Sequence, residues 1–591
     1  MRTRHRERPW GLVVDAWVVV LAAVLALPLV IHPGHGLAHD LMFTPRQPLT
    51  PDALGLGSSL PRAVPVDAVV ALLCRVVDGA VVYRVAVLGV LLLAGWGAHR
   101  LMGERSLPAR WCVATFAVWN PFVVERLGLG QWSFLASYAA AWWLVPAVVR
   151  YRSADPGTGD GRDLAAVVGW TALASLTPTG GLIACLLVGW PRGAHPDRRW
   201  GWSTGAAVLL QLPWLLPSLL TTASALTSPD SVAAFSARSE RPGGAFASLL
   251  GLGGIWSRDV VPASRGGVLG FATTGLVLLV LAAGVRRLPW GSRALVPLGA
   301  LGLLLAVASS TPSGDDVVSL LVGEVPGAGL LRDAQKWLLP FVLLVGACLG
   351  VVVDGLTGWV GRRAPELTGV LGIAAVLGPV VLLLDAPSVT WRVLQPVTYP
   401  ADFHRVAAAV EAGAGDLVTL PWQSYRRFAW GTDVTAADPA TRLFDVPVVV
   451  DDRLVVGGRR LEGEDRRAAS LTPVVTAGSL SAPRLREGGV RWVLVYVGQP
   501  SAARVGVTEL DRVYVGRNLA LYRVPGEVVV ADRAPTWKVV LVSAVNVLAL
   551  LAAVTAGAAA VLQQRRRPAH RSGGVADRHP DPDSSASLRS T

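Results

Sequence analysis

The chain has 591 residues, of which 52% are hydrophobic and 16% are charged. Soluble domains carry about 25% charged residues, so this composition excludes a soluble fold. A formal net charge of +13 would suggest nucleic acid as a partner of a soluble protein. Here the arginines gather at the ends of apolar stretches and in the C-terminal tail, which indicates membrane topology and no nucleic-acid partner.

About twelve apolar stretches are long enough, or nearly so, to cross ~30 Å of hydrocarbon as helices. They cover residues 11–32, 81–100, 108–124, 131–149, 164–178, 179–191, 201–221, 267–285, 294–310, 336–354, 368–385 and 537–562. The fifth and sixth are short and meet at Thr177-Pro178, where the sequence predicts a break. The pattern predicts a polytopic α-helical membrane protein in contact with membrane lipids.

Arginine falls in every second gap between these stretches, beginning with Arg2, Arg4, Arg6 and Arg8. The protein is expected in the plasma membrane. By the positive-inside rule, these gaps and both termini are expected on the cytoplasmic side. The remaining gaps, 33–80, 222–266, 311–335 and 386–536, are then expected on the outer face. The first stretch is long and lacks a small-residue cleavage site, so it is interpreted as a retained anchor.

The first outer loop, residues 33–65, concentrates polar side chains among proline and glycine. Asp40 is a candidate general base at the membrane surface with His39 beside it, and Arg46 is a candidate for meeting an anionic group. The alternative is a solvated loop whose acids cap helices, as Asp52 after Pro51 could.

A second cluster follows the third stretch. Asn120-Pro121 predicts the end or a kink of a helix, which leaves Glu125 and Arg126 at the outer boundary beside a glycine turn that ends at Gln131. An ionisable pair at this depth costs free energy unless it is paired or lines a wet cavity. The alternative to a site is a mutual Glu125–Arg126 ion pair that holds the turn.

A third cluster precedes the tenth stretch and includes Arg332, Asp333 and Lys336. If this segment is helical, Arg332 and Lys336 share one face and could meet a phosphate near the lipid headgroups. The alternative is a pair of interfacial cations that extend to the headgroups beside an anchoring Trp337. Lys336 and Lys538 are the only lysines of the chain.

The segment 386–536 is large enough to be a domain. It contains a helix-like run at 402–412 and strand-like runs at 417–420, 446–450, 491–497 and 519–524, which predict a small extracytoplasmic α/β or α+β domain. The expected organisation is a membrane domain at 1–385, the outer domain at 386–536, a final membrane helix at 537–562 and a disordered cytoplasmic tail at 563–591.

Several kinds of chemistry find no support in the sequence. It contains no GxxxxGK[ST] phosphate loop, GxSxG elbow or HExxH helix, so nucleotide-driven pumping is not indicated. The four cysteines are scattered and show no metal-ligand spacing.

Taken together, these residues resemble a known group. The acid in the first outer loop, Asn-Pro-Phe-Val-Val-Glu-Arg-Leu from Asn120, Leu-Arg-Asp-Ala-Gln-Lys from Leu331 and the late outer domain resemble the GT-C superfamily of integral membrane glycosyltransferases. Within it, the chain is similar to actinobacterial arabinofuranosyltransferase-like and mannosyltransferase-like proteins of the cell envelope. The likeness covers about the first two thirds of the chain.

The resemblance implies transfer of a sugar from a polyprenyl-phosphate donor to an envelope glycan or lipid acceptor on the outer leaflet. The base would be Asp40, the donor phosphate would meet Arg332 and Lys336, and Glu125 with Arg126 would shape the site. Where the family often shows two adjacent acids, this chain has His39-Asp40, which puts metal dependence and activity in question. If a divalent ion assists, Mg²⁺ or Mn²⁺ at Asp40 is the natural candidate.

Two other functions stay open on the sequence. A transporter or flippase for a lipid-linked glycan should show ionisable residues in mid-membrane and related halves, and few of the former and no clear repeat are visible. A non-catalytic scaffold with a degenerate transferase core is compatible with the single acid of the first loop.

Overall fold

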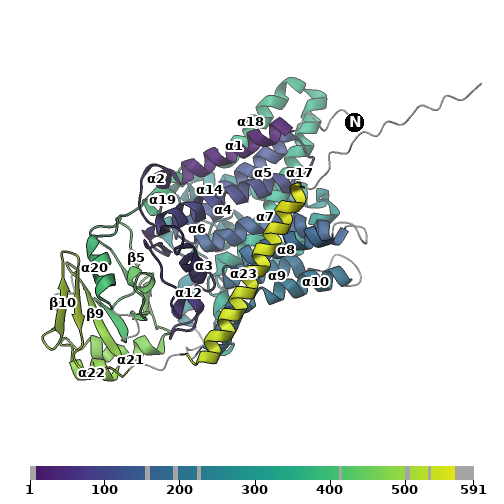
Figure 1. Cartoon of the computed structure of the whole chain (residues 1–591). Coiled ribbons are helices and arrows are strands. Elements are labelled where there is room, and N and C mark those ends of the chain that lie inside the picture. The colour runs from purple at the N-terminus through teal and green to yellow at the C-terminus, as the bar shows by residue number, and fades with distance from the viewer. Residues whose placement is uncertain are drawn as a thin grey trace, which may run out of the picture.

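The computed structural model describes residues 8–153, 160–190, 197–221, 228–410, 415–499, 506–529 and 534–565. Arg2, Arg4 and Arg6 and the tail after residue 565 lie outside the described residues. The described chain is mostly helical, with a smaller part that contains a sheet near the C-terminal end (Figure 1). These two parts are called the helical part and the sheet domain, the latter being residues 397–529.

Six helices of the helical part and the C-terminal end are long and apolar enough to cross a membrane. With the short 3₁₀ turns that adjoin them, they are α4 (Gly79–Leu101), α7 (Trp132–Ser153), α14 (Val268–Gly284), α15 (Leu295–Ala308), α17 (Leu339–Arg363) and α23 (Thr536–Arg565). Two further pairs of helices pass the same test only when the two members are taken together. They are α10 (Arg198–Leu209) with α11 (Leu212–Leu220), bent by 48°, and α18 (Thr368–Val381) with α19 (Ala386–Val393), bent by 50°. The chain is therefore a helical membrane protein.

The expected number of about twelve membrane helices is wrong by length and composition. The described residues contain six candidate spans, or eight if each bent pair counts as one. Several expected spans are helices too short to cross ~30 Å at 1.5 Å per residue. They are α1 (Arg8–Leu25), whose apolar part begins at Gly11, α5 (Leu107–Val118), α8 (Asp160–Ala174) and α9 (Pro178–Gly189).

The remaining short helices connect or flank these spans. They are α2 (Leu27–Ile31), α3 (Val66–Leu73), α6 (Pro121–Gly128), α12 (Asp230–Phe235), α13 (Gly244–Leu250) and α16 (Pro312–Glu324). The break predicted at Asn120-Pro121 is confirmed, because α5 ends at Val118 and the Asn120 side chain caps α6 by accepting from the Val123 N–H at 3.1 Å. The break predicted at Thr177-Pro178 is confirmed in the same way at the start of α9.

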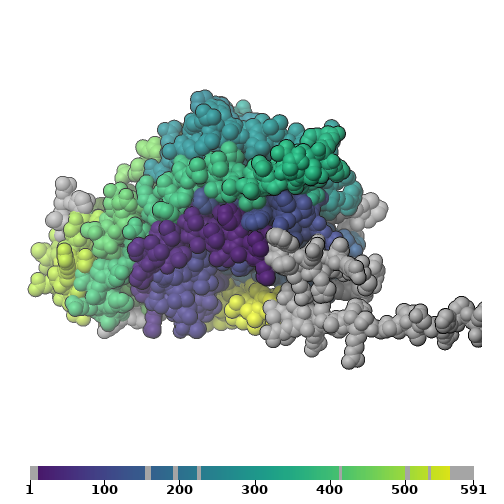
Figure 2. Space-filling view, turned by 90° about the horizontal axis from the view of Figure 1, so that it is seen from above, coloured from purple at the N-terminus to yellow at the C-terminus, as the bar shows by residue number. Residues whose placement is uncertain are grey.

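The first helix lies on the surface of the helical part. Its end is held by α19, since the Thr390 hydroxyl donates to the Leu25 carbonyl and the Trp391 indole donates to the Val24 carbonyl, both at 2.7 Å. Figure 2 shows this N-terminal helix in purple beside a green segment of the chain. Segments more than 360 residues apart in sequence thus meet just where the first outer loop begins.

The sheet domain contains a five-stranded mixed sheet in the order β10-β11-β9-β3-β6. Its strands are β3 (Asp416–Leu420), β6 (Val448–Val449), β9 (Val490–Tyr496), β10 (Asp511–Val515) and β11 (Leu519–Arg523). β3 is parallel to β6 and β9, while β9, β11 and β10 are antiparallel neighbours. The strand-like runs expected near 417–420, 446–450, 491–497 and 519–524 are confirmed.

Two apolar layers cover this sheet. Leu417 of β3 faces a cluster that includes α20 (Ala401–Ala409), and Val418 faces a cluster with α21 (Arg466–Val475) and α22 (Ala482–Glu487). The alternation follows from the two-residue period of a strand. The first cluster also contains Leu37 and Met42 of the first outer loop, so that loop is anchored in the core of the sheet domain.

Candidate active site

The first outer loop places Asp40 in a tight turn between two short strands, β1 (Leu37–Ala38) and β2 (Leu41–Met42). His39 has a φ of 48°, a left-handed conformation that is uncommon for residues other than glycine. Such strain persists only where the surroundings hold it and is frequent at functional sites. Here the His39 N–H donates to the Thr435 carbonyl at 2.7 Å, and the Ala437 N–H donates to the His39 carbonyl at 3.0 Å.

The glycine turn after α6 lets this loop approach. Gly130 has a φ of +77°, and a Cβ added to it would lie 2.4 Å from the backbone nitrogen of Leu41. Only glycine fits both constraints. The Asp40 N–H consequently reaches the Leu129 carbonyl at 3.1 Å, which fixes the first loop against the second cluster.

The Asp40 carboxylate receives one donor on each oxygen. The Gln131 amide donates to Oδ2 at 3.1 Å, and the Tyr425 hydroxyl donates to Oδ1 at 2.7 Å. Tyr425 belongs to the hairpin of β4 (Tyr425–Arg426) and β5 (Ala436–Ala437) in the sheet domain. The negative charge of Asp40, together with burial, raises the pKa of Tyr425 well above its ordinary value, so this hydroxyl stays a neutral donor.

The second and third clusters of the sequence join the same network. Arg126 donates to Gln131 Oε1 at 2.6 Å and to both carboxylate oxygens of Asp333 at 2.9 Å, and Lys336 Nζ lies 3.2 Å from Asp333 Oδ2. Burial alone would raise the pKa of Asp333, but the two cations hold it below its usual range. A continuous chain of polar contacts thus runs from Asp40 through Gln131, Arg126 and Asp333 to Lys336.

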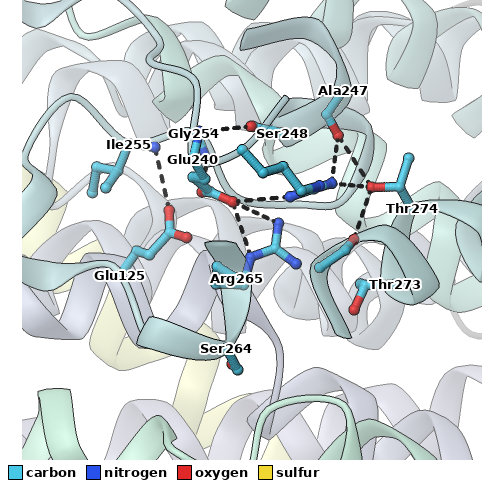
Figure 3. Close-up of polar contacts among 12 residues, drawn as sticks. Glu125, Glu240, Ala247, Ser248, Gly254, Ile255, Ser264, Arg265, Thr273 and Thr274 are labelled. Atoms are coloured by element: carbon cyan, nitrogen blue, oxygen red, sulfur yellow. Dashed lines mark hydrogen bonds and ion pairs between the residues drawn. The ribbon is translucent and has the colours of Figure 1, made fainter. Parts of the chain in front are cut away.

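The alternative of a Glu125–Arg126 ion pair is excluded, because Arg126 is bound to Asp333. The Glu125 carboxylate instead accepts from the Gln335 amide at 2.6 Å and from the Ile255 N–H at 3.3 Å. It lies in a buried cluster, shown in Figure 3, in which Glu240 is paired with Arg265 at 2.9 Å and with Arg241 at 3.3 Å. Burial and the charge of Glu240 raise the pKa of Glu125 well above its usual range, which favours the neutral acid.

Arg332 does not share a face with Lys336, contrary to the helical expectation. The segment Ala334–Leu338 is a 3₁₀ helix (η7) that begins after Arg332. Arg332 turns to the sheet domain, where it lies 3.2 Å from Glu464, and its guanidinium stands over the ring of Phe235 at 5.1 Å. Burial and the neighbouring Arg62 lower the pKa of Arg332 to about 10.

The alternative in which Trp337 is an interfacial anchor does not fit its surroundings. Its side chain is buried and its indole donates to the Leu330 carbonyl at 3.3 Å. Arg332 instead lines a pocket between the helical part and the sheet domain, with Arg62, Phe235, Asp452 and Glu464 among its other walls. Both arginines are bound to Glu464 there.

Three further residues of the first loop differ in their surroundings. Arg46 is exposed and makes no hydrogen bond or ion pair with any other described residue. Burial lowers the pKa of His39 despite the nearby Asp40, which favours a neutral ring. Asp52 does not cap a helix; its carboxyl is buried near Asp465, and its pKa is raised to about 6.

The residues around Asp40 do not fit a divalent metal ion. No group of three or more His, Cys, Asp or Glu side chains in the described part of the chain could hold one. Asp40 supplies a single carboxylate, and Mg²⁺ needs several oxygen ligands in near-octahedral geometry. The chemistry proposed below therefore uses no metal.

The sequence analysis missed Tyr425, Glu240, Arg241 and Arg265. Tyr425 follows the strand-like run at 417–420 without any motif, and only the fold brings it to Asp40. Glu240 and Arg241 are consecutive charges in an outer loop. The adjacent opposite charges of Glu240 and Arg241 could have marked them as candidates, although nothing in the sequence indicates that they are buried.

The arrangement defines a class of protein, a polytopic helical membrane protein in which a mixed α/β domain holds the loop between α2 and α3. The fold is similar to that of a solved cryo-EM structure of the arabinofuranosyltransferase AftD from mycobacteria, with a TM-score of 0.51 and 16% sequence identity. The matched region covers 88% of this chain and 42% of AftD, so the chain spans less than half the length of that protein. No family model and no curated protein matches the chain.

Proposed function

We propose that the chain is a membrane glycosyltransferase that moves a sugar from a polyprenyl-phosphate donor to a glycan or lipid acceptor of the cell envelope, on the outer face of the plasma membrane. The observation that carries the proposal is the chain of contacts from an exposed carboxylate, Asp40, to a cation, Lys336. The fold that it shares with AftD supports this class of reaction.

Asp40 is the proposed base. Its two donors leave lone pairs free, because an ionised carboxylate offers about four acceptor positions. In the reaction, the acceptor hydroxyl oxygen forms a bond to the anomeric carbon, its proton goes to Asp40, and the bond from that carbon to the donor phosphate breaks. The phosphate leaves with the bonding electrons, and no nucleotide is needed.

Lys336 is the proposed contact of the leaving phosphate. Its side chain is 25% exposed, whereas that of Arg126 is fully buried, so only Lys336 of the two can reach a ligand. Fixed positive charge stabilises the negative charge that grows on the phosphate in the transition state. Arg332 remains a second candidate in the adjoining pocket, provided that a phosphate displaces Glu464.

Product analysis tests the proposed function. Membranes that contain the full chain are incubated with radiolabelled polyprenyl-phosphate sugars, and the envelope fraction is examined for new glycosidic bonds. Transfer of label into a glycan or lipid supports the enzyme. Movement of the labelled lipid across vesicles without a new glycosidic bond would instead indicate a transporter. The absence of both transfer and movement with every donor would indicate a scaffold.

Lys336→Ala tests the donor site. This variant should raise the KM for the donor about tenfold or more and the acceptor KM much less, because a lost charged contact costs about 1.5–3 kcal/mol. Lys538→Ala is the matched control. Lys538 is the other lysine of the chain, belongs to α23 and donates to the Leu220 carbonyl. Equal increases in both KM values would argue against phosphate binding at Lys336.

A further inference from the structure

The sheet domain reaches the first outer loop through backbone pairing. The β4–β5 hairpin lies beside β1 and β2, and His39 bonds to the backbone on both sides of Ala436. Within the hairpin, Tyr425 is directly paired with Ala437. The position of the Tyr425 ring relative to Asp40 is therefore set by main-chain hydrogen bonds, which tolerate little displacement.

Buried polar contacts fix the hairpin from behind. The guanidinium of Arg426, the residue after Tyr425, donates to Asp438 Oδ2 at 2.7 Å and to Thr419 of β3 at 3.1 Å. It also stands over the ring of Tyr496 at 4.2 Å. Arg426 and Asp438 are fully buried, and charge-assisted hydrogen bonds of this kind are strong and directional. The hairpin is thus attached rigidly to β3 of the sheet.

Other contacts hold the sheet domain against the outer loops. Arg442 binds Asp67 at 3.0 Å, and the Ser58 hydroxyl donates to Asp465 at 3.0 Å. Glu464 is shared by Arg62 and Arg332. Asp40 consequently receives one donor from the helical part, Gln131, and one from the sheet domain, Tyr425, and the second is present only while the two parts are docked.

We propose that Tyr425 is a positioning residue of the transferase site: its hydroxyl, supplied by the docked sheet domain, orients the Asp40 carboxylate. This inference rests on the proposed function for its catalytic meaning. A hydrogen bond that is donated to an ionised carboxylate is strong and directional, so it fixes the orientation of the acceptor. The sheet domain is then a structural part of the catalytic centre.

The test uses the full chain in lipid nanodiscs and compares Tyr425→Phe with wild type. Carboxylate infrared difference spectra against Asp40→Asn report the hydrogen bonding of Asp40 itself, without any sugar transfer. Loss of the hydroxyl should shift the carboxylate stretching bands of Asp40, because one of the two hydrogen bonds that the carboxylate accepts is gone. Unshifted bands in a folded variant overturn the proposal.

The matched control is Tyr514→Phe, which removes another tyrosine–aspartate hydrogen bond of the same domain, from Tyr514 to Asp402 at 2.6 Å. This variant should leave the Asp40 bands unchanged, and a shift equal to that of Tyr425→Phe would also overturn the proposal. If sugar transfer is detected, Tyr425→Phe should lower kcat about tenfold, because a reacting group is misplaced, with the donor KM unchanged.

The two proposals fail in different ways. A wild-type protein that transfers no sugar with any donor, but whose Asp40 bands shift in Tyr425→Phe, loses the proposed function and keeps the positioning role. A wild-type protein that transfers sugar, with a Tyr425→Phe variant of normal kcat and normal Asp40 bands, keeps the function and loses the positioning role. A lower kcat with unshifted Asp40 bands shows a structural effect alone and contradicts the positioning role.

Discussion

At the scale of single residues, the pKa values of two carboxyl groups in neighbouring clusters are shifted in opposite directions. Arg126 and Lys336 hold the pKa of Asp333 below its usual range, whereas burial and the charge of Glu240 raise the pKa of Glu125 well above its usual range. Both residues were expected only to shape the site. Their surroundings favour different states, because Asp333 carries the charge that connects Arg126 to Lys336 while the surroundings of Glu125 favour the neutral acid.

This difference predicts unequal effects of removing charge at Glu125 and Glu240. Glu125→Gln keeps the size of the side chain and mimics the neutral form that its surroundings favour, so the melting temperature of the protein should change little. Glu240→Gln should lower it strongly, because it leaves Arg241 and Arg265 buried without their carboxylate, and breaking a buried ion pair costs about 3–5 kcal/mol. Thermal unfolding in detergent checks this, and a larger loss in Glu125→Gln would contradict the assigned states.

At the scale of elements, the strands and helix breaks were predictable because their signals are local. β3, β9 and β11 are runs rich in apolar and β-branched residues, and α6 and α9 begin where Asn120 and Thr177 precede proline. The number of spans was not predictable from hydropathy, because four of the expected apolar stretches fold as helices too short to cross the membrane, and a bend of 48° or 50° divides two further stretches into two helices each. The hydrogen bond from Tyr425 to Asp40 joins residues that are 385 positions apart in the sequence. No local pattern predicts such a contact.

The glycine turn after α6 gives a prediction about one such element. Gly130→Ala should displace the first loop, because its new Cβ would meet the Leu41 backbone as well as strain a positive φ. Gly327→Ala is the control, since Gly327 has a φ of +86° but nothing within 4 Å of an added Cβ. Sugar transfer should fall about tenfold in the first variant alone, as misplacing a reacting group is costly. Equal activities would show that loop approach is not required.

At the scale of the whole molecule, several carboxyl groups lie at the joint between the helical part and the sheet domain. Burial of Asp52 and the nearby Asp465, Asp416 and Asp67 raise the pKa of Asp52 to about 6. Hydrogen bonds and ion pairs fix the first loop to the sheet domain here, and ionisation of Asp52 at the same joint opposes this attachment.

The joint should accordingly weaken as the pH rises. The folded pKa of Asp52, about 6, is above the value of about 3.9 in an unfolded chain. The contribution of Asp52 protonation to the free energy of unfolding is therefore complete below about pH 3.9, declines as the pH rises to about 6, and is absent above that value. Asp52→Asn should therefore raise the melting temperature at pH 7.5 by more than at pH 5. Asp433→Asn changes an exposed carboxylate and should leave the melting temperature unchanged at both pH values. A pH-independent effect of Asp52→Asn would contradict the raised pKa.

The central claim is that Asp40 takes the proton of the acceptor hydroxyl, and single-turnover sugar transfer by Asp40→Asn tests it most directly. The amide is similar in shape to the carboxylate but cannot accept that proton, so the rate should fall by about 10²–10⁴-fold, the usual contribution of a general base. Asp316→Asn, at an exposed acid of α16, should transfer sugar at the wild-type rate. An Asp40→Asn protein that transfers sugar as fast as wild type would contradict the account.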